Sequence, residues 1–252
     1  MHAKKIVFLA SNTQSSRWVY NALKFVLPIN HAIIEQPVSK IQLFKRRIKK
    51  IGTLTVFGQV LFTLMIVPWL NWKAKNRRAE LLAKYSLNDS PFDKKLCSFV
   101  PSVNSDECFK FLQKLQPDIV LVNGTRIISK KILQSVNASF INMHVGITPW
   151  YRGAHGGYWA LYNNDVENFG TTIHLVDEGV DTGGILKYIF ATPGKADNFT
   201  TYPVIQIAEG IKALPELIND FINNNYTVSK PKEKGNLYQQ PAIWQYFKNS
   251  TR

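Results

Sequence analysis

The chain has 252 residues, of which 45% are hydrophobic and 19% are charged, a balance that is ordinary for a globular protein with a sizeable core and excludes a low-complexity chain. Its two cysteines, Cys97 and Cys108, are too few for a disulfide framework and lack the spacing of a metal site, so we expect reduced thiols, no metal and a cytoplasmic location. The net charge of +14 is large. The first apolar run, Ile6 to Ala10, is too short for a signal peptide and is expected to be a strand.

The N-terminal part of the chain predicts the opening of an α/β fold. The first strand is followed by the polar run Ser11 to Ser16, and a helix is expected to start near Arg17 with Ser15 or Ser16 as its N-cap. Strand, polar loop and helix in this order are typical of a dinucleotide-type fold. A second strand is expected over His31 to Glu35.

The rest of the chain continues this pattern. Helices are expected over Ser105–Leu115, Ile128–Ser135, Tyr158–Asn163 and Val204–Asn223, the last with Pro215 as a kink or a new start. Strands are expected over Asp118–Asn123, Ser139–Met143, Thr171–Val176 and Ile185–Ala191. The tail from Val228 to Arg252 is expected to be irregular or a hairpin. The sequence thus predicts an α/β, Rossmann-like domain with a mostly parallel central sheet over residues 1–225 and a short C-terminal extension over residues 226–252.

The positive charge is concentrated in one segment. Residues 40–84 contain eleven Lys or Arg and one acid, Glu80, so they carry +10 of the +14. Between the flanking basic runs, residues 51–72 have no charged side chain. We therefore predict a basic and hydrophobic helical insert at about residues 40–84.

Three environments are consistent with this insert. Seventeen residues of the uncharged run precede Pro68, which is at the lower limit for a membrane-spanning helix. Its polar residues gather toward one helical face: Thr53, Thr55, Gln59 and Thr63. The segment could also be an interfacial helix pair on anionic lipid, or a helix packed on the domain or on a partner subunit, which we favour. No recognised reading module accompanies Lys45 to Lys50, so no nucleic acid partner is expected.

Three side chains in the middle of the chain form a candidate catalytic group. Asn142 and His144 lie two residues apart at the end of the strand expected over Ser139–Met143, so both should project from the same face. Asp181 follows in a glycine-rich segment, which suits the tight backbone path of a site loop. Asn, His and Asp side chains can polarise a carbonyl, manage a proton and hold an imidazole in place.

The order of these residues resembles the folate-dependent formyltransferases. That family carries Asn-x-His at a strand end, then a Pro-x-x-Arg-Gly stretch, then an Asp in a glycine-rich loop. The matching residues here are Asn142 and His144, Pro149 to Gly153, and Asp181, and Gly124 to Ser129 is similar to the family's folate-pocket segment. The resemblance is close from Pro117 to Ile189 and loose outside that range.

The resemblance implies an N10-formyltetrahydrofolate-dependent N-formyltransferase, in which an amine attacks the formyl carbon through a tetrahedral oxyanion. It implies Asn142 as the oxyanion donor and His144 as oxyanion stabiliser or general base. Asp181 would orient His144 or a water and help to shuttle the proton. Which of His144 and Asp181 takes the proton stays open.

The resemblance also implies which residues hold the cofactor. Main-chain groups at the folate edge would bind the pterin, namely those of Arg126, Ile127 and Ile128. The loop that closes on the other side comprises Glu178, Gly179 and Val180. Candidates for the acceptor site lie after the first strand and after His144: Ser11, Asn12, Ser15, Arg17, Tyr151, Arg152 and His155. His174 alternates with Thr172 and Val176 on its strand and is expected to be structural.

The branches of this family differ in features that can be checked here. The tRNA enzymes carry a further C-terminal barrel domain, and twenty-nine positions follow Asn223 in this sequence. The glycinamide ribonucleotide enzymes carry a glycine-rich phosphate loop, which Ser11 to Ser16 replace. By elimination we expect N-formylation of a nucleotide-linked amino sugar for surface polysaccharide synthesis, such as lipopolysaccharide, with glycinamide ribonucleotide and methionyl-tRNA as alternative acceptors.

A hypothesis of a different class is a non-catalytic folate-binding or membrane-associated scaffold protein, tethered by residues 40–72. The presence of Asn142, His144 and Asp181 favours the enzyme. The expected partners are a small-molecule acceptor, the anionic inner face of a membrane, and a second copy, because an exposed apolar insert and tail would favour a homodimer.

Overall fold

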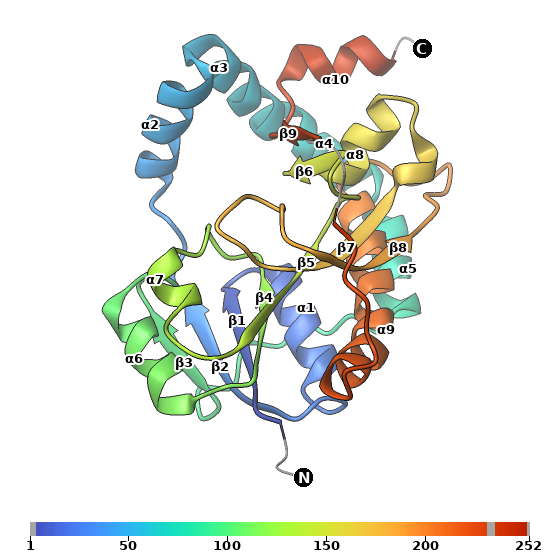
Figure 1. Cartoon of the computed structure of the whole chain (residues 1–252). Coiled ribbons are helices and arrows are strands. Elements are labelled where there is room, and N and C mark those ends of the chain that lie inside the picture. Colours follow the sequence, from blue (N-terminus) through green and yellow to red (C-terminus); the bar gives the residue numbers. More distant parts are fainter. Residues whose placement is uncertain (1–3, 231–234, 251–252) are drawn as a thin grey trace.

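The protein, described by a computed structural model over residues 4–230 and 235–250, is built on a seven-stranded sheet with the strand order β3-β2-β1-β4-β5-β7-β8 (Figure 1). The strands from β3 to β5 pair in parallel, whereas β7 pairs antiparallel with both β5 and β8. The strands are β1 (Ile6–Ser11), β2 (Ile29–Glu35), β3 (Cys97–Val100), β4 (Ile119–Asn123), β5 (Ser139–His144), β7 (Gly170–Leu175) and β8 (Ile185–Phe190). The expected α/β fold with a mostly parallel central sheet is confirmed.

The central strands β1 and β4 are apolar except for their last residues, Ser11 and Asn123, because both of their faces are covered. All residues of β1 and β4 are buried, which is typical of parallel strands between two helical layers. The strand order reverses between these two neighbours, since β2 and β3 continue on the far side of β1 while β5 follows β4. A crevice therefore opens at the carboxyl ends of β1 and β4, where open α/β sheets bind their ligands.

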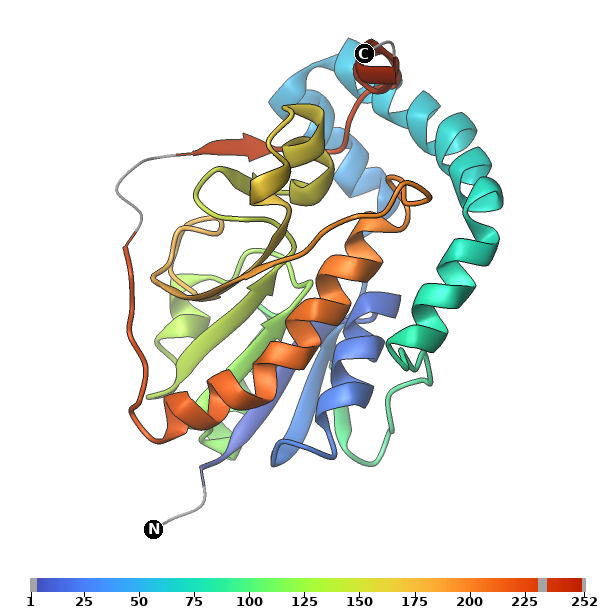
Figure 2. The same ribbon diagram turned by 90° about the vertical axis from the view of Figure 1, so that its right-hand side faces the viewer.

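Helices pack on both faces of the sheet (Figures 1 and 2). One face is covered by α1 (Gln14–Leu23), α5 (Lys75–Lys84) and α9 (Tyr202–Ile222), through core residues that include Trp18, Leu81 and Ile218. The other face is covered by α6 (Asp106–Leu115) and α7 (Lys130–Leu133), through Leu112 and Ile132. The helix α9 continues through Pro215.

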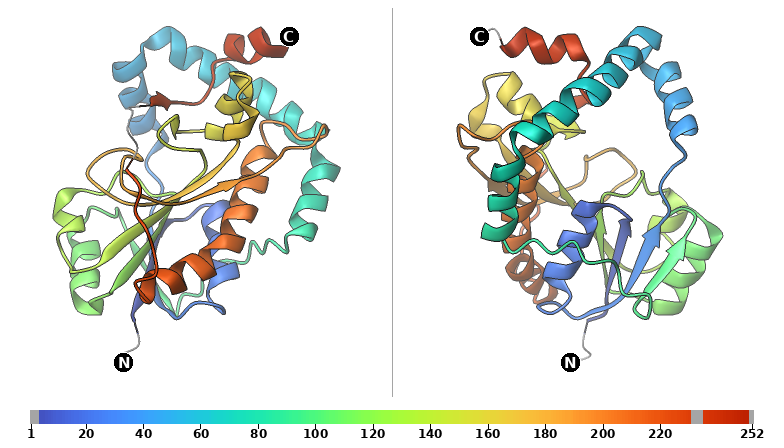
Figure 3. Two further views of the ribbon diagram at one scale, coloured as in Figure 1. Left: turned by 45° about the vertical axis from the view of Figure 1, so that its right-hand side comes forward. Right: turned by 180° about the vertical axis from the view of Figure 1, so that it is seen from behind.

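The insert between β2 and β3 is helical, as predicted. It comprises α2 (Lys40–Ile51), α3 (Thr53–Leu61), the π-helical turn η1 (Phe62–Ile66), α4 (Val67–Lys73) and then α5. We refer to residues 40–73 as the helical arm, which arches over the end of the molecule before α5 returns to the core (Figure 3). The helical run does not stop at Pro68 but continues to Lys73. An 18-residue window of this 21-residue run, Thr53–Lys73, has a mean hydropathy of 1.7, and 28% of that window is buried, so by length and composition alone the run could cross a membrane.

One side of the helical arm is anchored to the domain. Phe62 is fully buried, and its ring lies 4.9 Å from that of Phe199 and 5.4 Å from that of Tyr246. Gln59 Nε2 donates a hydrogen bond to the carbonyl oxygen of Gln240 at 2.7 Å. The insert thus packs on its own domain along one face, in agreement with the environment that the sequence favoured.

The tail is more regular than the sequence predicted. Its segment β9 (Asn236–Tyr238) pairs in parallel with β6 (Tyr151–Gly153), and the chain then forms α10 (Ile243–Ser250). The helix α10 packs on the helical arm, where the Trp244 ring occupies the space that a side chain at Gly58 would need. The prediction of an irregular or hairpin tail was wrong, because the partner of β9 lies far away in the sequence. The remaining short helices are α8 (Gly156–Tyr162) and η2 (Val166–Asn168).

Two local details also differ from the prediction. The helix α1 begins at Gln14, and its N-cap is Thr13, whose side chain accepts a hydrogen bond from the Ser16 N–H at 3.3 Å. Neither Ser15 nor Ser16 caps the helix, since both lie in its first turn. The strand β3 was not predicted, because it has four residues and lies at the edge of the sheet, where only one neighbour pairs with it.

Candidate active site

A cavity of about 350 Å³ lies at the carboxyl ends of β4 and β5, beside the point where the strand order reverses. Its apolar walls include Val122, Ile128, Val145 and Ile207. Its polar lining includes residues from the ends of three strands and from one loop: Asn123, Asn142, His144, His174, Asp177 and Asp181. Asn142, His144 and Asp181, predicted to act together, all line this one cavity.

Asn142 is held by a histidine on the neighbouring strand. The antiparallel register of β5 and β7 places His174 directly opposite Asn142, and Asn142 Nδ2 lies 3.1 Å from His174 Nε2. His174 Nδ1 lies 2.7 Å from the carbonyl oxygen of Leu175, which can only accept, so Nδ1 carries the proton. In the neutral ring Nε2 then accepts from the Asn142 amide. One N–H of that amide is thereby fixed, and the second remains for a ligand.

His144, the last residue of β5, is 7% exposed and faces acceptors on both sides of its ring. Nε2 donates to the carbonyl oxygen of Tyr151 at 2.9 Å, which leaves Nδ1 unprotonated in the neutral ring. Nδ1 lies 3.3 Å from Oδ2 of Asp181. Burial lowers the pKa of His144 below its ordinary value, and the Asp181 carboxylate offsets part of this shift. The ring is therefore neutral at pH 7, with its basic nitrogen beside a carboxylate.

Asp181 is placed by a loop that bends back over the ends of β5 and β7. Its backbone has a φ of 51°, in the left-handed region, and its Oδ2 accepts the Gly153 N–H at 2.9 Å. Its Oδ1 lies 3.6 Å from His174 Nε2. Although burial raises it, the pKa of Asp181 falls to about 2, because His144, His174 and the Gly153 N–H favour the ionised form. A fixed negative charge thus lies between the two imidazoles.

The arrangement combines two capabilities in one cavity. The amide of Asn142 can donate to a carbonyl oxygen, and His144 with Asp181 can accept and hold a proton. These are the requirements of acyl transfer to an amine. Among the residues that the structure describes, no group of three or more His, Cys, Asp or Glu side chains is arranged to hold a metal ion.

The segment expected to form the folate edge lines the cavity: Arg126, Ile127 and Ile128. Part of its main chain is engaged within the protein, since the Arg126 N–H donates to Glu35 and the Ile127 carbonyl accepts from Asn104. The Arg126 guanidinium forms an ion pair with the buried Glu35 at 2.6 Å. These contacts stiffen the segment, and a ligand there would use the main-chain groups that remain.

The loop expected to close on the other side is only partly in the cavity lining. Gly179 and Val180 line the cavity, together with Asp177. Glu178 does not, because its exposed side chain forms an ion pair with Lys130 at 3.0 Å. Two of the three expected loop residues therefore lie at the cavity, and Glu178 points away from it.

Of the four candidates after the first strand, Ser15 lines the cavity. Ser11 is buried. Arg17 is committed to an ion pair with Asp89 at 2.7 Å, and it also donates to Asn12 at 3.3 Å. Because its guanidinium is already neutralised, Arg17 is a poor candidate for a phosphate ligand in this arrangement.

None of the three candidates after His144 lines the cavity, and Tyr151 and Arg152 support residues that do. The ring of Tyr151 is buried, its hydroxyl donates to Asp165 at 2.7 Å, and its carbonyl holds His144. Arg152 donates to the carbonyls of Val180 and Gly235, and so ties the Asp181 loop to the tail. The centre of the His155 ring lies 4.6 Å from that of the Phe199 ring, and His155 does not line the cavity.

His174 is the site residue that sequence reasoning missed. Its alternation with apolar neighbours on β7 suggested a structural role, yet it is 3% exposed and contacts both Asn142 and Asp181. The signal that would have found it is the pairing of β7 with β5, which is not local in sequence.

Residues 74–192 match the family model described as "Formyl transferase". Among curated proteins, it is 42% identical over 86 residues to the methionyl-tRNA formyltransferase of Finegoldia magna, covering 34% of this chain and 27% of that enzyme. It is 33% identical over 137 residues to the Clostridium tetani enzyme of the same name, covering 52% of this chain and 43% of that enzyme. The chain thus spans less than half the length of these relatives.

Solved structures show the same fold at lower sequence identity. A sugar N-formyltransferase from Shewanella sp. superimposes with a TM-score of 0.56 at 17% identity, over 93% of this chain and 76% of that one. A phosphoribosylglycinamide formyltransferase from Streptococcus pneumoniae gives a TM-score of 0.55 at 19% identity, over 87% of this chain and 99% of that one. These similarities establish the fold, and they do not distinguish between acceptors.

Proposed function

The chain belongs to the formyl transferase family, whose model matches residues 74–192, and on that premise we propose that it transfers a formyl group from N10-formyltetrahydrofolate to the amine of a small acceptor. The observation that carries this proposal is the geometry of Asn142, His144 and Asp181 around one cavity. When bound, the folate supplies the formyl carbon and its oxygen. The cavity suits such a donor, because apolar walls and main-chain groups at the strand ends match a flat heterocycle with a polar edge.

Asn142 would stabilise the charge that develops on the formyl oxygen. Its amide nitrogen carries two donors, and His174 fixes one of them, so the other is held in direction before the ligand arrives. Preorganised donors of this kind act without reorganisation at the moment of reaction. His174 thus serves as a positioning residue for Asn142.

His144 and Asp181 would take the proton from the attacking amine. The neutral ring presents Nδ1 as a base, because Nε2 is bound to the Tyr151 carbonyl. His144 Nδ1 lies 3.3 Å from Oδ2 of Asp181, so the carboxylate would stabilise the imidazolium that forms when Nδ1 takes up a proton. We therefore propose His144 as the proton acceptor and Asp181 as the group that stabilises it.

For the acceptor we propose a nucleotide-linked amino sugar. The support is the sequence Ser11 to Ser16, which replaces the glycine-rich phosphate loop of the glycinamide ribonucleotide enzymes. Methionyl-tRNA is the second candidate, because curated relatives of that name share 42% and 33% identity with parts of this chain. We also propose that the enzyme is cytoplasmic.

The test is a formyl-transfer assay with N10-formyltetrahydrofolate and a panel of acceptors: nucleotide-linked amino sugars, glycinamide ribonucleotide and methionyl-tRNA. Two variants serve as the negative and the positive control. His144→Ala should abolish turnover, and His31→Gln, a histidine on β2 outside the cavity lining, should retain it. Turnover with an amino sugar supports the proposal. Turnover with methionyl-tRNA alone would mean that methionyl-tRNA is the acceptor. If the protein neither transfers a formyl group to any acceptor nor binds reduced folate, the proposed function is wrong.

A further inference from the structure

The helical arm carries an apolar stripe that the described part of the chain leaves exposed. The side chains along it are between 47% and 76% exposed: Leu54, Phe57, Leu64, Met65, Trp69 and Trp72. Apart from the adjacent pair Leu64 and Met65, successive members are three, four or seven residues apart, so they share one face of the helix that runs from Thr53 to Lys73. Contiguous apolar patches on soluble proteins mark interfaces with proteins or membranes.

The opposite face of the same helix is held by the domain. Val56, Phe62 and Leu70 are at most 2% exposed, and the buried Gln59 donates to the Gln240 carbonyl. A helix that crossed a bilayer would lose these contacts and would place the Gln59 amide in hydrocarbon. The anchored face therefore requires that the helix lies along a surface and not across a membrane.

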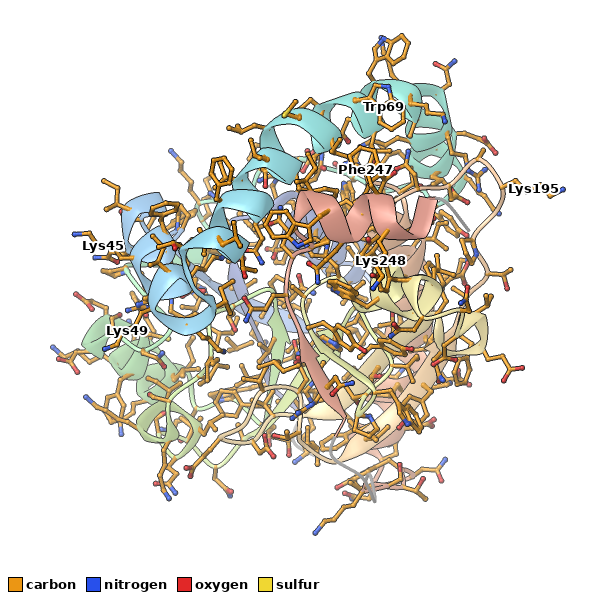
Figure 4. All side chains as sticks on the ribbon, turned by 90° about the horizontal axis from the view of Figure 1, so that it is seen from above. Lys45, Lys49, Trp69, Lys195, Phe247 and Lys248 are labelled. Carbon is orange, nitrogen blue, oxygen red and sulfur yellow. The ribbon has the colours of Figure 1, made fainter. Side chains whose placement is uncertain are left out.

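The helix α2 adds positive charge beside this stripe. Residues 40–51 contain six Lys or Arg and no Asp or Glu. The side chains from Ile41 to Lys50 are exposed, with Ile48 partly so, and they include Ile41 at 68% and Phe44 at 47%. Figure 4 shows Lys45 and Lys49 at one end of the arm, Trp69 toward the other, and Phe247 on α10 alongside. A twelve-residue helix is marginal in water without packing, so α2 needs a surface that matches both its apolar and its basic side chains.

We propose that the helical arm docks in plane on the surface of an anionic lipid bilayer. The Lys and Arg side chains of α2 bind lipid phosphates, and the apolar stripe enters the boundary between head groups and acyl chains. Trp69 and Trp72 lie at the level that tryptophan prefers in membranes. The arm crosses the end of the molecule to which the parallel strands point, so docking turns the cavity-bearing edge of the sheet toward the lipid (Figure 1).

Other occupants match this surface less well. A second copy in a two-fold contact would bring two identical arms together, each with seven Lys or Arg and no Asp or Glu over residues 40–73. Nucleic acid would satisfy the charge of α2 but would leave Leu54, Phe57 and Leu64 unpartnered. Anionic lipid is the one surface that matches charge and apolar stripe together.

The charge is tested by flotation with vesicles of phosphatidylcholine alone and with phosphatidylglycerol added. The wild-type protein should bind the anionic vesicles and be released by high salt. Lys45→Gln/Lys49→Gln/Lys50→Gln should weaken binding by roughly a hundredfold. A control removes the same charge elsewhere, Lys94→Gln/Lys95→Gln/Lys110→Gln, and should bind like the wild type. All six side chains are exposed, so circular dichroism and melting temperature should not change.

The apolar stripe is tested in the same assay. Phe57→Ser/Leu64→Ser/Trp72→Ser should reduce vesicle binding at least tenfold. Phe25→Ser/Val166→Ser/Phe190→Ser, which changes equally exposed apolar residues elsewhere, should not. Three results would overturn the proposal: equal binding to neutral vesicles, tighter binding to duplex RNA than to anionic vesicles, or a stable dimer in ultracentrifugation that dissociates when the stripe is changed and does not bind vesicles.

Discussion

His174 Nε2 lies 3.1 Å from Asn142 Nδ2, because the antiparallel register of β5 and β7 sets the two residues directly opposite each other. The proton on His174 Nδ1 is fixed by the Leu175 carbonyl, which thus orients the Asn142 amide through two successive hydrogen bonds. The amide is set by the sheet itself and not by a loop, which is the rigid support that the proposed oxyanion donor requires.

Replacing Asn142 with alanine should slow turnover without unfolding the protein. Loss of one oxyanion donor raises the barrier by roughly 3–4 kcal/mol, which corresponds to a kcat lower by about two to three orders of magnitude. Asn142 is half-buried at the strand end, so the melting temperature should change little. The measurement is kcat in the formyl-transfer assay alongside thermal unfolding. A kcat close to that of the wild type would remove Asn142 from the mechanism.

Replacing His174 with leucine should lower kcat about tenfold with little change in KM, because the amide of Asn142 loses its acceptor. His174→Gln should recover much of the activity, since its amide oxygen can accept at the position of Nε2. The double variant His174→Leu/Asn142→Ala should be no slower than Asn142→Ala alone. If the two effects multiply instead, His174 acts independently of Asn142.

The sequence was sufficient to predict the elements whose signal is local. The apolar run of β4 predicted a buried strand, and β4 is buried. The spacing of Asn142 and His144 on β5 predicted that both side chains project from one face, and both line the cavity. His174 was missed because its role depends on the pairing of β7 with β5, which residue spacing does not encode. The tail was missed for the same reason, since β9 pairs with the distant β6.

Some differences arose from competing local choices. The run Thr13-Gln14-Ser15-Ser16 offers several hydroxyl groups that can cap a helix, and Thr13 does so because it lies just before the first turn. Glu178 was expected at the folate site, but Lys130 lies within reach on the neighbouring helix and draws the carboxylate outward. Such pairings depend on which segments meet in three dimensions.

The Asp181→Asn variant should change the pH dependence of kcat/KM in a defined direction. In the wild type, kcat/KM should fall as pH decreases through the pKa of His144, which burial lowers and Asp181 raises. Removing the carboxylate removes the raising contribution, so the acidic limb should move to lower pH. The plateau should also fall by one to two orders of magnitude, on the order of a general-base effect, because the imidazolium loses its partner. The measurement is the profile of kcat/KM from acidic to mildly alkaline pH for both proteins. An acidic limb that moves to higher pH in the variant would contradict the assigned roles.

His155 should make the stability of the fold depend on pH outside the active site. Burial, with a smaller contribution from Arg47, lowers the pKa of His155 from 6.5 to about 4. The unfolded chain therefore binds a proton in this range while the folded protein does not, so stability is full above about pH 6.5 and falls as pH decreases toward 4. Protonation of His155 alone lowers the free energy of unfolding by at most about 3 kcal/mol.

The matched variant for this test is His155→Asn, because His155 has a φ of 60° and asparagine tolerates that conformation. The variant loses the contact with the Phe199 ring and should be less stable at pH 7.5, but its stability should fall less steeply between pH 6.5 and 4.5. Urea unfolding at four pH values measures both slopes. Parallel slopes in the two proteins would show that His155 takes up its proton as easily in the folded protein as in the unfolded chain, and that its burial against Phe199 has no electrostatic consequence.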